Sequence, residues 1–356
     1  MKKRKPDNAL LFPEIAIGPE NPWITAAKRL DGGSKGSGLT TLEICAGAGG
    51  QAIGLEQAGI EHAGLVELDK HACATLRLNR PGWNVIEQDL NEFDGTPFKG
   101  IDLISGGLPC PPFSVAGKQL GKKDERNLFP AMIRLVDQVR PRAVMIENVR
   151  GFLDAVFEDY RGFVKKELQK LGYEPGWKLM NASDFGVPQL RPRVVFVAVR
   201  KDLAEHFCWP QPLEHLPKSV GETLLDLMAA NGWSGARAWA QQANEIAPTV
   251  VGGSHKHGGP DLGPTRARRA WAQLCVDGLG IANEAPGADF PITSMPRLTV
   301  RMVARIQGFP DEWRFAGGKT QSYRQVGNAF PPPFARAVAE QLKACLTVPR
   351  LVRVAG

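Results

Sequence analysis

The stretch Leu39-Thr40-Thr41-Leu42-Glu43-Ile44-Cys45-Ala46-Gly47-Ala48-Gly49-Gly50 decides the predicted fold. Its first half is rich in β-forming residues, its second half is a glycine-rich turn, and a helical pattern runs from residue 51 to 57. A strand, a glycine-rich turn and a helix in this order open the nucleotide-binding half of a doubly wound α/β sheet. The turn lacks the GxGxxG spacing and no Lys-Ser/Thr pair follows it, so it is not a P-loop.

Acidic residues follow the next two predicted strands. Glu67 ends the strand predicted at 63–66, about twenty residues after the turn, where a carboxylate accepts hydrogen bonds from ribose hydroxyls. The alternative for Glu67 is an exposed acid before the helix predicted at 70–79, which Asp69 can cap. Asp89 follows a third, short strand, and either accepts an amine of a cofactor base or forms an Asx turn.

A cysteine lies among prolines after the fourth predicted strand, 101–104. The sequence there is Gly106-Gly107-Leu108-Pro109-Cys110-Pro111-Pro112-Phe113-Ser114. The two glycines predict a sharp turn and the prolines a stiff loop, which places Cys110 at the carboxyl end of a strand, where ligands bind in open α/β sheets. For one cysteine alone, a small buried thiol is the better interpretation, and only further residues reverse it. Glu147 likewise follows the strand predicted at 143–146, either as a cap or as a group in the pocket.

Composition narrows the class of protein. The chain has 356 residues, 43% hydrophobic and 23% charged, which suits two domains or one large α/β domain with an insertion. No apolar run can span a bilayer, and the N-terminus lacks the apolar core of a secretory signal. The six scattered cysteines contain no CxxC pair, which argues against disulfides and zinc and favours a reducing cytoplasm. His255 and His257 have no third ligand at a suitable spacing, so no metal is predicted. The net charge of +7 permits binding to nucleic acid without requiring it.

The ordered set of motifs resembles the DNA (cytosine-5)-methyltransferases of bacterial and phage restriction–modification systems. Nine segments occur in that family's order: 43–50, 67–69, Asp89, 108–114, 126–129, 147–149, 189–193, 297–310 and 325–332. Two departures are visible, since Cys45 stands where the family usually has Phe, and Pro111 where many members have Gln. The resemblance implies an α/β fold, with a Rossmann-like S-adenosylmethionine-dependent methyltransferase sheet and an inserted, smaller and irregular target-recognition domain.

The resemblance also implies a reaction and the residues that perform it. A cytosine is flipped out of the duplex, the Cys110 thiolate adds to C6, protonated Glu147 donates to N3, and C5 takes the methyl group of S-adenosylmethionine. Asn148 is expected to hold the Glu147 carboxyl, Arg193 to bind the cytosine O2, and Arg191 to support the loop. The residues expected at the cofactor are Cys45, Ala46, Gly47, Gly49, Glu67, Asp89, Pro109, Leu128, Asn328 and Ala329. The residues expected at the DNA are Ser114, Lys118, Lys122, Lys256, Arg266, Arg268 and Arg269. A solvated surface is the alternative for these basic clusters.

The expected organisation has four parts. They are a flexible basic leader at 1–38, a catalytic and cofactor-binding domain at 39–200, a target-recognition domain at 201–296, and a return segment at 297–356 whose C-terminal helix completes the catalytic domain. The expected partners are double-stranded DNA and, in function rather than in physical contact, a cognate restriction endonuclease. A cytoplasmic monomer without membrane contact is expected.

Two other functions are compatible with parts of this sequence. A tRNA cytosine-5 methyltransferase uses the same scaffold, but the long Trp- and Gly-rich recognition segment and the missing Cys-Phe-Thr signature of that branch favour duplex DNA. A catalytically silent DNA-binding protein is the second alternative, and the intact Cys110, Glu147 and Arg193 argue against it.

Overall fold

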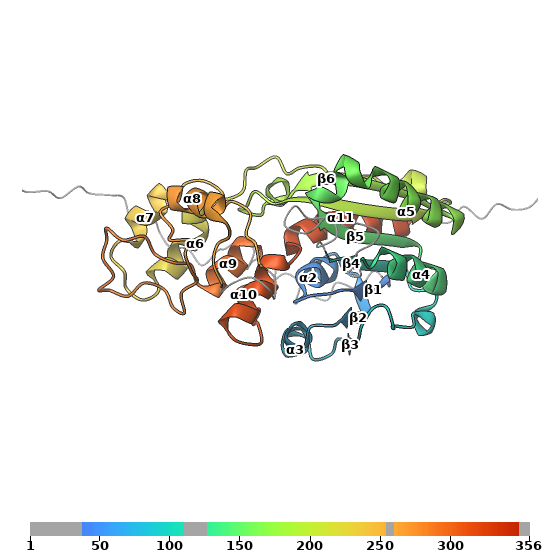
Figure 1. Ribbon diagram of the computed structural model, residues 1–356, viewed down its shortest axis with the longest axis horizontal. Helices are drawn as coiled ribbons and strands as arrows, with labels where there is room; N and C mark the ends of the chain where they lie inside the picture. The colour runs from blue at the N-terminus through green and yellow to red at the C-terminus, as the bar shows by residue number, and fades with distance from the viewer. Residues whose placement is uncertain (1–37, 110–126, 254–259, 349–356) are drawn as a thin grey trace, which may run out of the picture. The chain divides into compact units, whose positions relative to one another are not determined.

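The computed structural model describes residues 38–109, 127–253 and 260–348, all within one compact unit, Gly36–Gly356. At its centre is a seven-stranded sheet with the order β3-β2-β1-β4-β5-β7-β6 (Figure 1). The strands are β1 Thr40–Ile44, β2 Glu61–Glu67, β3 Val85–Glu87, β4 Leu103–Gly107, β5 Ala143–Val149, β6 Tyr173–Asn181 and β7 Pro192–Arg200. Strand β7 runs antiparallel to both of its neighbours, and the other pairs are parallel. The prediction of a Rossmann-like α/β sheet is confirmed.

The order of the strands places a switch point beside β1, because β1 pairs with β2 on one side and with β4 on the other. In open α/β sheets, ligands bind outside the carboxyl ends of the strands at such a point. The acids predicted at strand ends, Glu67 and Glu147, therefore lie at the carboxyl ends of the strands, on the side of the sheet where β4 ends before Pro109.

Helices cover both faces of the sheet, so its central strands β1, β4, β5 and β7 are largely buried. The helices around it are α2 Gly50–Gln57, α3 Lys70–Asn79, α4 Phe129–Val139, α5 Glu158–Lys170 and α11 Pro332–Leu346 (Figure 1). Ile146 of β5 packs in a hydrophobic cluster with α4 and α5, whereas its neighbour Met145 packs with α11. Successive strand residues point to opposite faces, which explains why β5 is apolar at consecutive positions. None of the described helices is long and apolar enough to cross a membrane.

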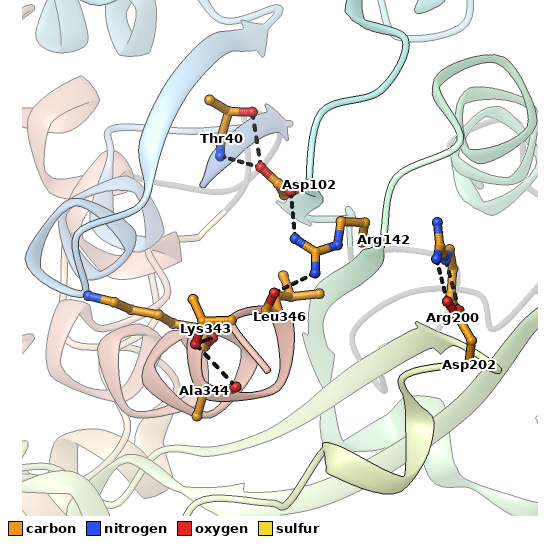
Figure 2. A network of polar contacts seen from close by, with 9 residues as sticks. Thr40, Asp102, Arg142, Arg200, Asp202, Lys343, Ala344 and Leu346 are labelled. Atoms are coloured by element: carbon orange, nitrogen blue, oxygen red, sulfur yellow. Dashed lines mark hydrogen bonds and ion pairs between the residues drawn. The ribbon is translucent and has the colours of Figure 1, made fainter. Parts of the chain in front are cut away.

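At the amino ends of the central strands, hydrogen bonds connect the sheet to the last helix, α11 (Figure 2). The Asp102 carboxylate accepts hydrogen bonds from the Thr40 amide at 2.9 Å and from Nη1 of Arg142 at 3.0 Å. Arg142 also donates to the Leu346 carbonyl near the end of α11. These bonds join β1, β4, β5 and α11 at the end of the strands that is remote from the predicted site.

The segment after β7 is irregular, and its described residues contain no strand. The helices from here to α11 are α6 Val220–Ala229, α7 Ala236–Gln242, α8 Thr265–Gln273, α9 Val300–Ile306 and α10 Lys319–Asn328. Among the described residues, the short 3-10 helices are η1 Thr96–Phe98, η3 Arg150–Leu153, η4 Ala155–Phe157, η5 Ala182–Phe185 and η6 Ala204–His206. Trp271 of α8 shares one hydrophobic cluster with Met302 of α9 and Val326 of α10. The segment therefore shares its core with α9 and α10, and the predicted domain boundaries stay a prediction.

The two glycines before the cysteine do not form a turn, contrary to the sequence prediction. Gly106 and Gly107 are the last residues of β4 and pair with Ile146 and Glu147 of β5. A Cβ at Gly106 would lie 2.2 Å from the Ile44 carbonyl oxygen. Glycine is needed there for the close approach of two strands, not for a change of direction.

Candidate active site

A carboxylate and a guanidinium meet at the carboxyl end of the central strands. Glu147 in β5 and Arg193 in β7 have side chains that are 8% and 12% exposed, and Nε of Arg193 lies 2.6 Å from Oε1 of Glu147. The Nε–H of Arg193 does not point at this oxygen or at another acceptor among the described residues. The contact is therefore an ion pair rather than a directed hydrogen bond. A Cβ at Gly107 would lie 3.4 Å from Oε2 of Glu147, so the glycine leaves space beside the carboxylate.

The predicted nucleophile follows this point in the sequence. Leu108 is buried, Pro109 is half-buried, and Cys110 comes next in the chain. The predicted residues that lie outside the described ranges are Cys110, Ser114, Lys118, Lys122 and Lys256, together with Pro111, His255 and His257. The structure therefore brings Glu147 and Arg193 together at the end of β5, where Glu147 pairs with Gly107, two residues before Pro109, and the position of the thiol stays a prediction.

Asn148 is buried beside Glu147 but does not contact its carboxyl in the structure. Its Oδ1 accepts the amide of Val149 at 2.9 Å, and its Nδ2 has no partner within the described part of the chain. Neighbouring strand residues point to opposite faces, which separates the two side chains. The expected role of Asn148 stays a prediction.

Arg191 lies fully buried between three segments. Its Nη1 donates to the Val250 carbonyl at 2.7 Å, and its Nη2 donates to the carbonyls of Gly327 at 3.0 Å and Ala329 at 2.9 Å. Its own amide donates to Oδ1 of Asn181 at 2.8 Å. These contacts are those of a residue that supports a loop, and they join the segment before β7 to the end of α10.

The turn after β1 adopts conformations that suit glycine. Gly47 and Gly49 have φ of +56° and +90°, and Cys45 has φ +50°. The amide of Ala46 donates to Val66 at 3.2 Å, and the amide of Gly49 donates back to Ala46 at 3.2 Å. A Cβ at Gly47 would meet no atom within 4 Å, so space is open beside the turn. Burial raises the pKa of the Cys45 thiol, which stays protonated and packs as a small apolar group.

Glu67 reaches from the end of β2 to this turn. Its Oε2 accepts the Gly47 amide at 2.7 Å, and its Oε1 accepts the amides of Leu68 and Asp69 at 2.8 Å each. Burial raises the pKa of Glu67, although these three amides oppose the shift. Asp69 caps α3 by accepting a hydrogen bond from the His71 amide at 2.8 Å. The cap of this helix is therefore Asp69, and the Glu67 carboxylate bonds to the turn instead.

The remaining cofactor candidates surround the same turn or its neighbours. Asp89 accepts the amide of Asn91 at 2.8 Å, which is the Asx turn foreseen as its alternative. Asp89 is nonetheless close enough to Cys45 for its charge to raise the pKa of that thiol, as Glu67 also does. A Cβ on Gly50 would lie 3.0 Å from Cβ of Ala329, so Ala329 lies against the turn. Leu128 packs on the hydrophobic cluster that includes Cys45, and Asn328 is the exposed last residue of α10.

Three of the predicted DNA contacts share one helix. Arg266 and Arg269 of α8 are exposed and Arg268 is half-buried, whereas Trp271 on the same helix is buried in the core. A Cβ on Gly278 would lie 3.1 Å from Cγ of Arg268, so the stem of that arginine packs on the protein. Helix α8 is thus fixed to the core by its buried side, and its arginines present guanidinium groups to solvent.

Two buried glutamine side chains form a chain of hydrogen bonds that the sequence patterns do not predict. Gln189 and Gln307 are fully buried, and Nε2 of Gln189 donates to Oε1 of Gln307 at 2.8 Å. Oε1 of Gln189 accepts the Val250 amide at 2.8 Å, and Nε2 of Gln307 donates to the Val326 carbonyl at 2.9 Å. Both glutamines lie in segments that carried the family resemblance, and that was the available signal.

Comparisons with known proteins agree with this arrangement. Residues 39–344 match the family model of the C-5 cytosine-specific DNA methylases. The Type II methyltransferase M.NgoMIV of Neisseria gonorrhoeae is 55% identical over 85% of this chain and 97% of its own length. The Type II methyltransferase M.NaeI of Lentzea aerocolonigenes is 54% identical over 87% of this chain and 76% of its own length. A solved DNA modification methyltransferase encoded within an E. coli prophage is 25% identical with a TM-score of 0.60, over 85% of this chain and 98% of that one. Dnmt2 of Spodoptera frugiperda, at 19% identity and a TM-score of 0.59 over 85% and 99%, shares the fold.

Proposed function

Since this chain belongs to the C-5 cytosine-specific DNA methylases, we propose that it methylates C5 of a cytosine flipped out of a specific site in duplex DNA, through a covalent bond between Cys110 and C6. At the coarser level the chain is a DNA (cytosine-5)-methyltransferase of the Type II restriction–modification kind. The observation that carries the finer proposal is the buried Glu147–Arg193 pair, because Glu147 pairs with Gly107 of β4, which precedes Cys110 by three residues in the sequence.

The proposed reaction uses the side chains as follows. The Cys110 thiolate adds to C6, which places a pair of electrons on C5. Protonated Glu147 donates its proton to N3, and Arg193 donates a hydrogen bond to O2. Together they neutralise the negative charge that the addition places on the ring. After methylation, a base removes the proton on C5 and the Cys110 sulfur leaves C6, which restores the ring.

The residues at the β1 turn fit S-adenosylmethionine. The half-buried Glu67 carboxylate suits ribose hydroxyls, Asp89 suits an adenine amine, and the open space beside Gly47 admits a ligand next to the backbone. The residues proposed to hold the cofactor are Cys45, Ala46, Gly47, Gly49, Glu67, Asp89, Pro109, Leu128, Asn328 and Ala329. When bound, S-adenosylmethionine supplies the methyl group as an electrophile.

DNA recognition is proposed for the segment 201–296. The guanidinium groups of Arg266, Arg268 and Arg269 suit phosphates or base edges, and α8 projects them from a fixed helix. Ser114, Lys118, Lys122 and Lys256 complete the proposed set. A monomer and a functional pairing with a cognate endonuclease are part of the same proposal.

The direct test traps the covalent bond. When S-adenosylmethionine is present, C5 of a 5-fluorocytosine in the duplex is methylated but carries a fluorine where the proton must leave, so the Cys110 sulfur cannot depart from C6 and the enzyme stays attached. We expect a complex stable in denaturant with the wild type and none with Cys110→Ala, which should still bind DNA. No trapped complex from an active wild type would contradict the proposed mechanism.

The site and the class of nucleic acid are read from two further assays. Bisulfite sequencing of DNA from a methylation-deficient host that expresses the chain should show protected cytosines at one recurring sequence. Tritiated methyl groups should enter duplex DNA and not tRNA in a side-by-side assay. Incorporation into tRNA alone would replace the DNA proposal with the tRNA alternative.

A further inference from the structure

Trp313 connects the C-terminal part of the chain with the cofactor turn. Its indole Nε1 donates a hydrogen bond to the Ala48 carbonyl at 3.1 Å, and the side chain is 5% exposed. The two residues are 265 positions apart, so no local pattern links them. Ala48 lies between Gly47 and Gly49, the two glycines that shape the turn.

The indole also occupies the space beside Gly49. A Cβ at Gly49 would lie 2.9 Å from Cζ2 of Trp313 and 2.9 Å from Cδ2 of Leu76. Glycine therefore meets two needs at this position, a φ of +90° and room for the indole. At Gly47, by contrast, a Cβ would meet no atom within 4 Å. Trp313 thus closes one side of the turn and leaves the Gly47 side open.

Arg80 also contacts the indole. The Arg80 guanidinium lies 5.3 Å from the Trp313 ring centroid and 5.7 Å from that of Trp83. Arg80 also forms two hydrogen bonds of 2.8 Å with the Glu56 carboxylate in α2. Cation–π contacts with two rings and a two-point ion pair restrict the orientation of the indole.

We propose that Trp313 is a positioning residue for the cofactor, which it acts on by holding the Ala48 carbonyl and hence the turn. This inference rests on the proposed function. The other side-chain anchor of the turn is Glu67, whose Oε2 accepts the Gly47 amide at 2.7 Å. Glu67 is also proposed to bind the ribose, so its bonds change when the cofactor arrives. Trp313 supplies an anchor that does not depend on the ligand.

The test is Trp313→Phe, which keeps an aromatic ring and removes the N–H. The dissociation constant of S-adenosylmethionine, measured by titration calorimetry, should rise about five- to tenfold, the range expected from one lost hydrogen bond. The KM for S-adenosylmethionine should rise in parallel, and kcat at saturating cofactor should stay within about twofold. A residue that acted only on stability would not separate KM from kcat in this way.

Trp233→Phe is the matched control. Trp233 is 4% exposed, and its Nε1 has no hydrogen-bond partner within the described part of the chain. The substitution therefore removes the same atoms from a buried site without removing a bond. We expect a lower melting temperature, as for Trp313→Phe, but an unchanged dissociation constant for S-adenosylmethionine.

Two results would overturn the inference: cofactor affinity in Trp313→Phe equal to that of the wild type, or an equal loss of affinity in Trp233→Phe. If Trp313→Phe does not fold, Arg80→Gln removes the guanidinium from the indole and should weaken cofactor binding about two- to threefold, and unchanged affinity would overturn the inference as well. A wild type that does not bind S-adenosylmethionine would overturn the proposed function itself. A wild type that binds normally, with variants that bind equally well, rejects only the role of Trp313.

Discussion

Gly252 and Gly327 lie backbone against backbone, with no room for a side chain between them. A Cβ at Gly327 would lie 2.4 Å from both the amide nitrogen and the Cα of Gly252. A Cβ at Gly252 would in turn lie 2.6 Å from Oδ1 of Asn328. Arg191 bonds to the carbonyls of Val250 and Gly327 at the same junction. Gly252, at the start of the glycine-rich stretch of the proposed recognition segment, therefore packs against the end of α10. It lies there beside Asn328, which is proposed to bind the cofactor.

Gly327→Ala should open this junction. The added methyl group must push two backbones apart, which costs about 2 kcal/mol of the free energy of unfolding. The KM for DNA should rise as well, because the segment proposed to contact DNA begins at this contact. Urea denaturation and initial rates against DNA concentration measure the two effects. Gly82→Ala is the control, since a Cβ at Gly82 meets no atom within 4 Å, and it should stay within about 0.5 kcal/mol of the wild type. A Gly327→Ala protein with wild-type stability would contradict the tight packing described here.

Arg191→Lys should destabilise the protein despite its retained charge. The guanidinium bonds to three carbonyl oxygens from one buried position, and a single ammonium group cannot reach all three. Carbonyls left without donors in the interior should cost about 2–3 kcal/mol in the free energy of unfolding. Arg200→Lys tests the same change at the surface, where the partner Asp202 has a side chain that is 55% exposed, and should cost under about 1 kcal/mol. Similar losses for the two variants would be inconsistent with the proposed supporting role.

Glu147→Gln should lower kcat about a hundredfold or more while the enzyme still binds DNA. The amide keeps the shape of the carboxyl but cannot give up a proton to N3 of the cytosine. Single-turnover incorporation of tritiated methyl groups measures the rate, and a gel-shift titration measures DNA affinity. Glu87→Gln changes a carboxylate that is 42% exposed and paired with Arg77, and should leave the rate unchanged. A rate within about threefold of wild type for Glu147→Gln would remove Glu147 from the reaction.

Stability should fall in acid because His62 is buried as a neutral base. Burial lowers the pKa of His62 from 6.5 to about 4, and its Nε2 lies 3.1 Å from the Ala52 carbonyl, to which it donates. Between pH 6.5 and 4 the unfolded chain binds more protons at this histidine than the folded chain. The contribution of His62 is therefore complete above pH 6.5 and is lost as the pH falls to about 4, by about 3 kcal/mol in total.

The groups that face His62 decide how this effect is measured. Oε2 of Glu43 lies 3.7 Å from Nδ1 of His62, and burial followed by the charge of Glu67 raises the pKa of Glu43. The raised pKa of Glu43 has the opposite effect on stability, because the folded chain binds more protons at this carboxyl and the free energy of unfolding falls as the pH rises. Glu56 is a further acid close enough to act on His62. The slope of unfolding free energy against pH should thus be compared between wild type and His62→Gln, which should have the smaller rise between pH 4 and 6.5. Equal slopes would show that folding does not lower the pKa of His62.

Periodicity and turn residues predicted most of the sheet but not all of it. The helix predicted at 70–79 is α3 Lys70–Asn79, and the apolar runs at 143–146 and 194–199 lie within β5 and β7. Strand β6 was not foreseen, because Pro175 and Gly176 interrupt its pattern. Both residues are tolerated there because β6 is an edge strand, paired on one side only with β7.

The sequence by itself determined the fold class, the family and the acids at the strand ends, because these depend on local order and on motifs that keep their spacing. Only the tertiary structure decided which distant groups meet: Glu147 with Arg193, Gln189 with Gln307, Gly252 with Gly327, and Trp313 with Ala48. The reason is physical, since an ion pair, a hydrogen bond or a close backbone contact across 46 to 265 positions leaves no periodic trace in the chain. Such contacts come from the packing of strands and helices, which brings their ends to one edge of the sheet.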